Sequence, residues 1–111
     1  MIDETIQRIE ETVQSAGALD AAQRDRLLSL VGELKREVTG LASTHQEQAQ
    51  SIAGFAQVGA HEAMRVDKDQ DLLRHSLDGL AASVERFEAT HPRLVSVVES
   101  IEQLLRNIGL G

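Results

Sequence analysis

The most regular apolar stripe of this chain lies in residues 73–108, LRHSLDGLAASVERFEATHPRLVSVVESIEQLLRNI. Its members recur at alternating steps of four and three residues, the spacing of one face of a helix. They are Leu73, Leu77, Leu80, Val84, Phe87, His91, Leu94, Val98, Ile101, Leu105 and Ile108. Pro92 interrupts the stripe because it lacks an N–H and clashes with the carbonyl four residues before it. The stripe therefore predicts helices over 67–90 and 92–108. Because the spacing continues unchanged across Pro92, both helices are predicted to face the same partner surface.

A second stripe with the same spacing precedes the first one. It consists of Leu27, Val31, Leu34, Val38, Leu41, His45, Gln48, Ile52, Phe55, Gly59, Glu62 and Val66. Asp20 and Gln23 stand at the spacing of a capping box, so a helix is expected to begin there. The stripe predicts one helix over 20–66, of coiled-coil period. Interior glycines disfavour a helix in 42–63, so a break near residue 43 is the alternative.

The N-terminal segment carries a shorter stripe of the same kind. Its members are Ile2, Ile6, Ile9, Val13 and Ala16. They predict a helix over 2–16, which ends before Gly17.

A cluster of charged residues, Arg65–Asp71, separates the two long stripes and indicates a chain reversal. A reversal centred on Lys68 would pair Val38 with Val98 and Gly59 with Leu77, so that stripe meets stripe. The arms also match in length, about 70 and about 63 Å at 1.5 Å per residue. The rival is one continuous helix, because the heptad spacing persists through the charged cluster. The predicted fold is a single all-α domain of residues 1–111, a long antiparallel helical hairpin with a short N-terminal helix.

This hairpin cannot cover all of its apolar side chains by itself. Leu28, Val95, Val97 and Leu104 lie beside the stripes. We expect helix 2–16 and a second copy of the chain to cover them, giving a helical bundle or coiled coil formed by a homo-oligomer, most simply a dimer. The expected contact seam is Leu27, Val31, Leu34, Val38, Leu80, Val84, Phe87, Leu94, Val98, Ile101 and Leu105. No internal repeat is evident.

Composition argues against several classes of partner. The 111 residues carry a net charge of −7, which repels nucleic acid and anionic membranes. There is no cysteine, so thiolate chemistry is excluded. Residues 1–4, Met-Ile-Asp-Glu, are acidic where a signal peptide needs a basic start. We expect a cytoplasmic protein that binds neither nucleic acid nor membrane.

The four histidines are the most suggestive polar residues. In the predicted hairpin His45 would meet His91, and His61 would meet His75. Facing imidazoles can hold a transition metal, with Glu47, Glu62 or Glu88 as further ligands, and can respond to pH. The simpler interpretation is a polar layer that fixes register, with His61 and His75 facing solvent, and on that interpretation the protein has no metal site.

No arrangement of residues predicts catalysis. His61-Glu62 begins the zinc-protease pattern His-Glu-x-x-His, but Arg65 stands where the second histidine is needed. No nucleophile motif or phosphate-binding glycine loop is present. We therefore expect no enzyme, no catalytic residues and no cofactor.

Two segments resemble a known family. Phe87–Leu94, FEATHPRL, and Asn107-Ile108-Gly109 resemble domain-of-unknown-function family 4404, and Leu19-Asp20, Arg24, Leu27-Leu28 and Leu34 resemble its second helix. The resemblance covers residues 5–41 and 76–110, with 42–75 as an added stretch. It implies a bacterial, cytoplasmic helical protein and supplies no activity, cofactor or catalytic residue.

The function that these observations favour is a non-enzymatic protein–protein interaction or scaffold role. The expected partners are a second copy of the chain and an unidentified protein. The alternative is a metal- or pH-responsive binding protein that uses the paired histidines.

Overall fold

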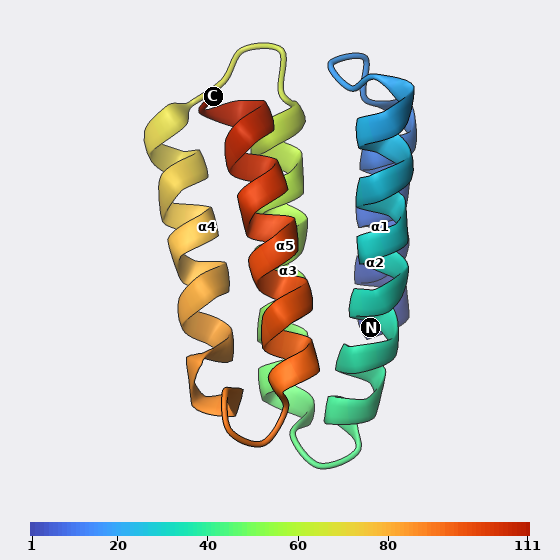
Figure 1. Cartoon of the computed structure of the whole chain (residues 1–111), viewed down its shortest axis with the longest axis vertical. Helices are drawn as coiled ribbons and strands as arrows, with labels where there is room; N and C mark the ends of the chain where they lie inside the picture. The colour runs from blue at the N-terminus through green and yellow to red at the C-terminus, as the bar shows by residue number, and fades with distance from the viewer.

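Helices make up all the regular structure of the computed structural model, which describes residues 1–111 (Figure 1). They are α1 (Ile2–Ser15), α2 (Ala21–Ala42), α3 (Gln46–Met64), α4 (Gln70–Val84), the 3₁₀ turn η1 (Glu85–Phe87) and α5 (Pro92–Gly109). The predicted all-α class is confirmed. None of these helices is long and apolar enough to cross a bilayer.

The last four α-helices form an antiparallel bundle in which each runs opposite to the next (Figure 1). Around it, α2 packs on α3, α3 on α4, α4 on α5 and α5 on α2. The first helix, α1, lies outside this square against α2 and α3. Helix α3 consequently contacts all four other α-helices. The bundle measures 37 × 24 × 22 Å.

The capping box predicted for residues 20–23 is present at the start of α2. The Gln23 N–H donates to Asp20 Oδ1 at 2.8 Å, and the Asp20 N–H donates to Gln23 Oε1 at 3.1 Å. These two bonds satisfy backbone donors that a helix start leaves free. Arg24, one turn later, donates to the carbonyl oxygens of Val13, Ala16 and Leu19 at 3.4, 2.6 and 3.4 Å. The turn between α1 and α2 is thus fixed by side chains of α2.

The long two-helix hairpin is wrong in its extent, because both arms are broken. The arm over 20–66 ends α2 at Ala42 and begins α3 at Gln46, and the other arm reverses between Phe87 and Pro92. The break near residue 43, held above as the alternative, is the correct one. Four short helices bury apolar side chains on two sides, whereas a two-helix hairpin buries them on one, so breaking the arms removes more apolar area from water.

The residue pairs predicted between the two arms are still formed, because both arms break at the same layer. A Cβ atom built on Gly59 would lie 3.1 Å from Leu77 Cδ2, and the rings of His45 and His91 lie 6.4 Å apart. The molecule is the predicted hairpin folded in half at the His45/His91 layer. The segments on either side of Pro92 therefore pack against each other as α4 and α5, and the prediction that they face one partner surface is wrong.

The structure contains an internal repeat that the sequence analysis missed. The buried residues of α2 are Leu27, Leu30, Val31, Leu34, Val38 and Leu41, and 46 residues later stand Leu73, Ser76, Leu77, Leu80, Val84 and Phe87, all buried. His45 and His91 have the same backbone conformation, φ −139° ψ 64° and φ −136° ψ 62°. Hairpin α2–α3 therefore repeats as α4–α5. Identical residues recur at three of these buried positions, Leu27/Leu73, Leu34/Leu80 and Val38/Val84, and in the Thr-His dipeptide that precedes α3 and α5.

Helix α1 packs on the first hairpin and has no counterpart on the second. It lies against α3, in which Ala53 and Ala56 are buried. The equivalent residues of α5 are Glu99 and Glu102, which stay partly or fully exposed. Small apolar side chains admit a neighbouring helix closely, and carboxylates keep their water.

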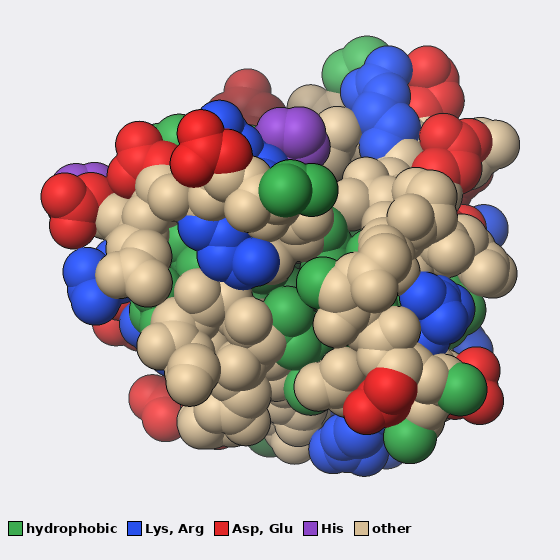
Figure 2. Space-filling model, turned by 90° about the horizontal axis from the view of Figure 1, so that it is seen from above, with side chains coloured by type: hydrophobic (Ala, Val, Ile, Leu, Met, Phe, Trp, Pro, Cys, Tyr) green, Lys and Arg blue, Asp and Glu red, His purple; other side chains and the backbone are tan.

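One cluster of 28 buried residues forms the core. Val95 and Val97 belong to it, and Leu28 and Leu104 pack against it. The single chain thus covers the four side chains for which a second copy was expected. Seen from above, both acidic and basic side chains stand on the end of the molecule that faces the viewer (Figure 2).

Candidate interaction surface

The four sides of the bundle differ in what covers them. Helix α1 covers the side formed by α2 and α3. The side formed by α5 and α2 is bridged by Arg93, whose Nη2 lies 3.0 Å from Glu33 Oε1 and whose Nε lies 3.6 Å from Glu37 Oε2. Helix α1 therefore closes one side, and an exposed ion-pair bridge spans another.

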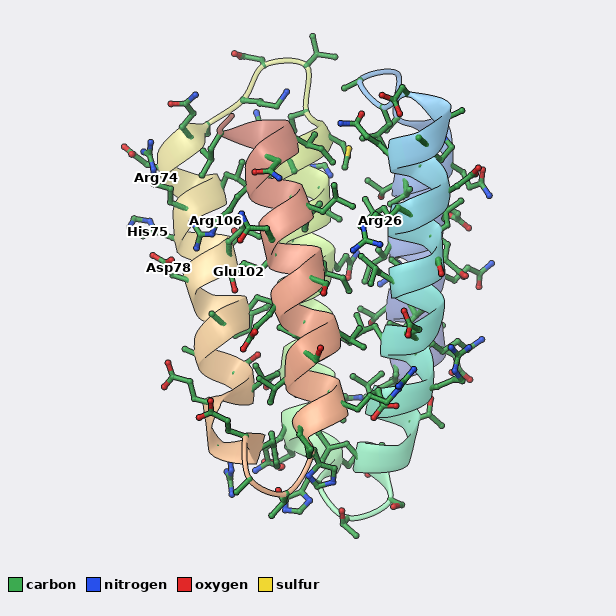
Figure 3. The ribbon with its side chains drawn as sticks, viewed as in Figure 1. Arg26, Arg74, His75, Asp78, Glu102 and Arg106 are labelled. Atoms are coloured by element: carbon green, nitrogen blue, oxygen red, sulfur yellow. The ribbon has the colours of Figure 1, made fainter.

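The side formed by α4 and α5 is acidic. Arg106 of α5 joins the two helices, with Nη2 at 2.8 Å from Asp78 Oδ1 and Nε at 3.0 Å from Glu102 Oε1 (Figure 3). The hydrogen bond that Arg106 donates to Asp78 raises the pKa of Arg106, so this guanidinium stays charged. A shallow groove on this side is lined by four carboxylates together with small and apolar residues: Ala81, Val84, Glu85, Glu88, Val95, Val98, Glu99 and Glu102. An acidic protein is a poor partner for this side.

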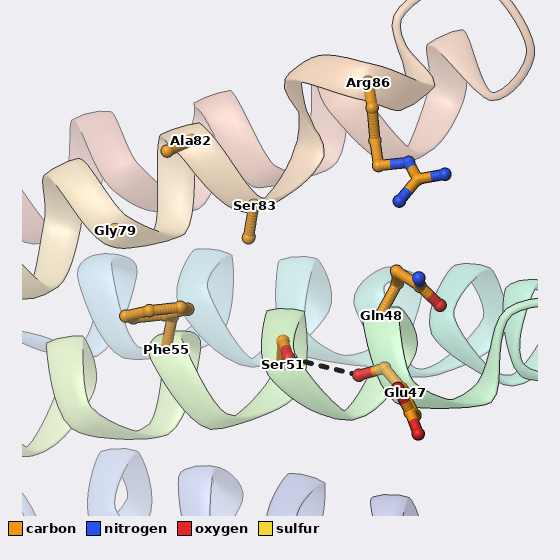
Figure 4. Close-up of a pocket in the computed structure, with 8 residues that line it drawn as sticks. All are labelled: Glu47, Gln48, Ser51, Phe55, Gly79, Ala82, Ser83 and Arg86. Carbon is orange, nitrogen blue, oxygen red and sulfur yellow. Dashed lines mark hydrogen bonds between the residues drawn. The ribbon is translucent and has the colours of Figure 1, made fainter.

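The remaining side, formed by α3 and α4, holds an open groove of about 450 Å³ (Figure 4). We call it the α3/α4 groove. Its lining residues are Glu47, Gln48, Ser51, Phe55, Gly79, Ala82, Ser83 and Arg86. Charges stand only at one end of it, so the rest of the groove is uncharged.

Phe55 forms the apolar floor of this groove. Its ring lies flat between the two helices, next to Gly79 (Figure 4), and 40% of the residue is exposed. A Cβ atom at position 79 would lie 2.5 Å from Phe55 Cε1 and 2.7 Å from Cδ1. Glycine is therefore required at position 79 for this close approach. The other aromatic residue, Phe87, is buried, so Phe55 is the one aromatic side chain that a partner can reach.

The hydroxyl groups along the groove are already satisfied by the backbone. Ser51 Oγ donates to the Glu47 carbonyl oxygen at 3.1 Å, shown dashed in Figure 4, and Ser83 Oγ donates to the Leu80 carbonyl oxygen at 2.6 Å. A partner that covers these serines leaves no hydroxyl proton without an acceptor. The middle of the groove can accept an apolar surface at little cost.

Glu47 and Arg86 stand on opposite walls at one end of the groove (Figure 4). Neither side chain forms an ion pair within the chain. The Arg86 guanidinium carbon lies 5.3 Å from the centre of the Phe87 ring, which steadies it without neutralising it. Both charges are free to pair with another molecule.

The structure places the predicted contact seam inside the chain. All eleven of its residues, Leu27, Val31, Leu34, Val38, Leu80, Val84, Phe87, Leu94, Val98, Ile101 and Leu105, are buried in the single-chain core. They form contacts between the helices of one molecule, so a partner must use other residues. Two stripe positions of the sequence analysis are instead exposed, Phe55 in the groove and Val66 in the loop before α4.

One of the two predicted histidine pairs forms. The His45 and His91 rings lie edge to face, 6.4 Å apart, and each also lies edge to face against Phe87. Nδ1 of His45 lies 2.8 Å from Thr44 Oγ1, and Nδ1 of His91 lies 2.9 Å from Thr90 Oγ1. This arrangement holds both rings in place at one end of the bundle.

The other predicted pair is not formed. His61 of α3 lies beside Thr12 of α1, whereas His75 projects outward from α4 (Figure 3), and α1 and α4 do not touch. Glu62 is buried and accepts from Arg65 at 2.9 Å, which raises the pKa of Arg65. No group of three or more His, Asp or Glu side chains is arranged to hold a metal ion.

One feature of the sequence corresponds to the groove, an uncharged stretch of α3. Residues 48–60, QAQSIAGFAQVGA, carry no charge, although 26% of the chain is charged. A helix surface without charges is buried against a partner at lower cost than a charged one. Phe55, 40% exposed, lies in the groove, whereas Val58, 44% exposed, lines a hollow shared with Thr12 of α1.

Comparison with known proteins gives a match over the second half of the chain. Residues 57–110 match the family described as Domain of unknown function (DUF4404), which confirms the resemblance seen at Phe87–Leu94. The match also includes residues 57–75, which were expected to be an addition, and it does not include 5–41. No curated protein and no solved structure gives a significant match.

Proposed function

We propose that this protein acts without catalysis, as an interaction or scaffold protein that associates with itself through the α3/α4 groove. The supporting observation is Phe55, a large apolar side chain that remains 40% exposed in a groove whose charges stand only at one end. Exposed apolar surface of this kind typically marks a site of protein association. The proposal places the protein in the bacterial cytoplasm, as the family resemblance implies.

The core residues of the single chain do not need a partner, so association would join molecules that are already folded. Such a contact is expected to be weaker than an obligate interface, because only part of one side is buried. A role of this kind fits a small helical protein with no catalytic constellation. An unidentified protein with a similar apolar helix could use the same groove.

The proposal is tested by the mass of the protein in solution. We expect sedimentation velocity on the native sequence to give a dimer at high micromolar concentration, and Phe55→Asp to give a monomer with unchanged helix content. The matched control is Val66→Asp, which places the same charge on a fully exposed residue and should leave the dimer intact. A monomeric native protein across the concentration range would disprove the proposal.

A second candidate function rests on the His45/His91 pair. Its rings meet at the end of the bundle, and the Nδ1 contacts with the preceding threonines leave both Nε2 atoms available. Second-sphere hydrogen bonds of this type orient histidine ligands. This candidate predicts that zinc raises the melting temperature of the native protein and of His75→Ala, but not that of His91→Ala. An unchanged melting curve, together with no metal in the purified protein, removes it.

A further inference from the structure

We infer that the α3/α4 groove receives the same groove of a second copy, across a two-fold axis that runs along it. This inference rests on the proposed function and specifies its geometry. It says which residues of the two copies meet, a point that the proposed function does not specify.

Charge selects this side of the bundle for self-association. Two copies of a chain of net charge −7 repel each other, and the α4/α5 side would bring eight carboxylates together, from Glu85, Glu88, Glu99 and Glu102 of both copies. The α5/α2 side carries the carboxylates of Glu33 and Glu37 around Arg93, and α1 covers the α2/α3 side. On the α3/α4 side, the charged residues that line the groove are Glu47 and Arg86, which are of opposite sign.

Phe55 gives the two copies an apolar contact within the groove. A two-fold axis parallel to the groove brings the α3 wall of one copy against the α4 wall of the other. The Phe55 ring of each copy already covers Gly79 of its own chain, and the small residues Ala82 and Ser83 continue the α4 wall beside it. The axis places the two Phe55 rings at the same height, so their exposed faces meet.

The charges at the end of the groove are also complementary to themselves. Glu47 belongs to the α3 wall and Arg86 to the α4 wall, at the same end (Figure 4). The same axis that brings the walls together places Glu47 of one copy opposite Arg86 of the other, and the reverse. Two ion pairs form between copies from two residues that have no ionic partner within one. A perpendicular axis would separate these charges, so they fix the direction of the axis as well as the face.

The arrangement continues the packing of the single chain. Neighbouring helices of the bundle run antiparallel, and in the proposed dimer α3 of one copy runs antiparallel to α4 of the other. The result is a third four-helix bundle, made from α3 and α4 of both copies, between the two original ones.

Charge reversal tests the ion pairs. We expect Glu47→Arg and Arg86→Glu each to raise the dimer dissociation constant at least tenfold, because each variant places two pairs of like charges in contact. Combining both substitutions in one chain should restore the dissociation constant to within about threefold of the native value, since the pairs re-form with exchanged signs. The matched control is Glu11→Arg on α1, an exposed residue outside the groove. It makes the same change in net charge as Glu47→Arg and should not weaken the dimer.

Engineered cysteines give a second, independent readout in a chain that has none. Ser51 and Ser83 lie on opposite walls at the same height (Figure 4), so the axis places Ser51 of one copy opposite Ser83 of the other. An oxidised mixture of Ser51→Cys and Ser83→Cys proteins should give mainly the mixed disulfide dimer. The control is Ser96→Cys, on the exposed surface of α5, which should not form a mixed disulfide dimer with either protein.

These experiments distinguish the inferred two-fold axis from self-association through the α3/α4 groove. If Phe55→Asp dissociates the native dimer but the charge reversals do not, or the double variant stays as weak as the single ones, the inferred axis is wrong and the proposed function stands. A native protein that never dimerises overturns both.

Discussion

The rings of His45 and His91 lie 6.4 Å apart, edge to face, although the two residues begin different helices. Each is preceded by a threonine that contacts its Nδ1 atom, and both pack against Phe87. The two repeated hairpins thus meet at one point through equivalent residues. The layer at which the chain is folded in half is also the layer at which its two halves are joined.

Removing both histidines should lower the free energy of unfolding by less than the sum of the two single substitutions. His45→Ala and His91→Ala are each expected to lower the free energy of unfolding by about 1 to 2 kcal/mol, through lost ring packing and a lost hydrogen bond. Because the rings touch each other and share Phe87, we expect a coupling of about 0.5 to 1.5 kcal/mol in the double variant. Urea unfolding of the four proteins measures this cycle. His75→Ala is the control, and strict additivity of the two losses would contradict the shared contact.

Arg24 should stabilise the turn between α1 and α2. It donates to three carbonyl oxygens at and beyond the C-terminal end of α1, and Arg24→Ala is expected to lower the free energy of unfolding by about 1.5 kcal/mol. Arg26→Ala, two residues along the same helix, removes an exposed guanidinium and should change it by less than about 0.5 kcal/mol. Thermal unfolding followed by circular dichroism compares the two. Equal effects of both variants would show that the carbonyl contacts contribute nothing specific.

Two glycines of α3 should respond differently to alanine. No atom lies within 4 Å of a Cβ built on Gly54, so Gly54→Ala is expected to stabilise the protein by about 1 kcal/mol through helix propensity alone. A Cβ on Gly59 meets the buried Leu77 side chain at 3.1 Å, and this crowding should cancel the gain or reverse it. The measured quantity is the difference between the two denaturation midpoints. A gain at Gly59 as large as that at Gly54 would mean that α3 and α4 can separate freely.

Val98→Asp should unfold the single chain. The residue is fully buried in the core, and an unpaired carboxylate there is expected to lower the free energy of unfolding by about 4 kcal/mol or more. Ser96→Asp, an exposed residue of the same helix, is the control and should leave the melting curve almost unchanged. Loss of the dimer with retention of the native melting temperature would instead assign Val98 to an intermolecular contact.

Local sequence signals determined where most helices begin and which residues are buried. The Asp20–Gln23 capping box starts α2, and Pro92 starts α5 because it fits the first helical turn, where no N–H is needed. The apolar spacing selected much of the core, since most of the same side chains are buried in any antiparallel pairing of the two stripes. It did not select Leu30, Val95 and Val97, which are buried beside the stripes. The charged cluster around Lys68 is the turn between α3 and α4.

The break after Ala42 was not decided by local signals. Residues 43–45 contain no proline or glycine, and the stripe runs through them in phase, so the local pattern suits one long helix as well as two short ones. The advantage of the break lies in contacts between α3 and α4 and the remaining helices, which a single stripe cannot reveal.

The sequence by itself determined the helical class, the apolar core residues and the pairing of His45 with His91. Tertiary structure alone decided that this core closes within one chain, and that the α3/α4 groove with Phe55 remains uncovered. The physical reason is that periodicity specifies which face of a helix avoids water, but not whether that face meets its own chain or another copy. That choice depends on the total apolar area buried when the hairpin folds in half.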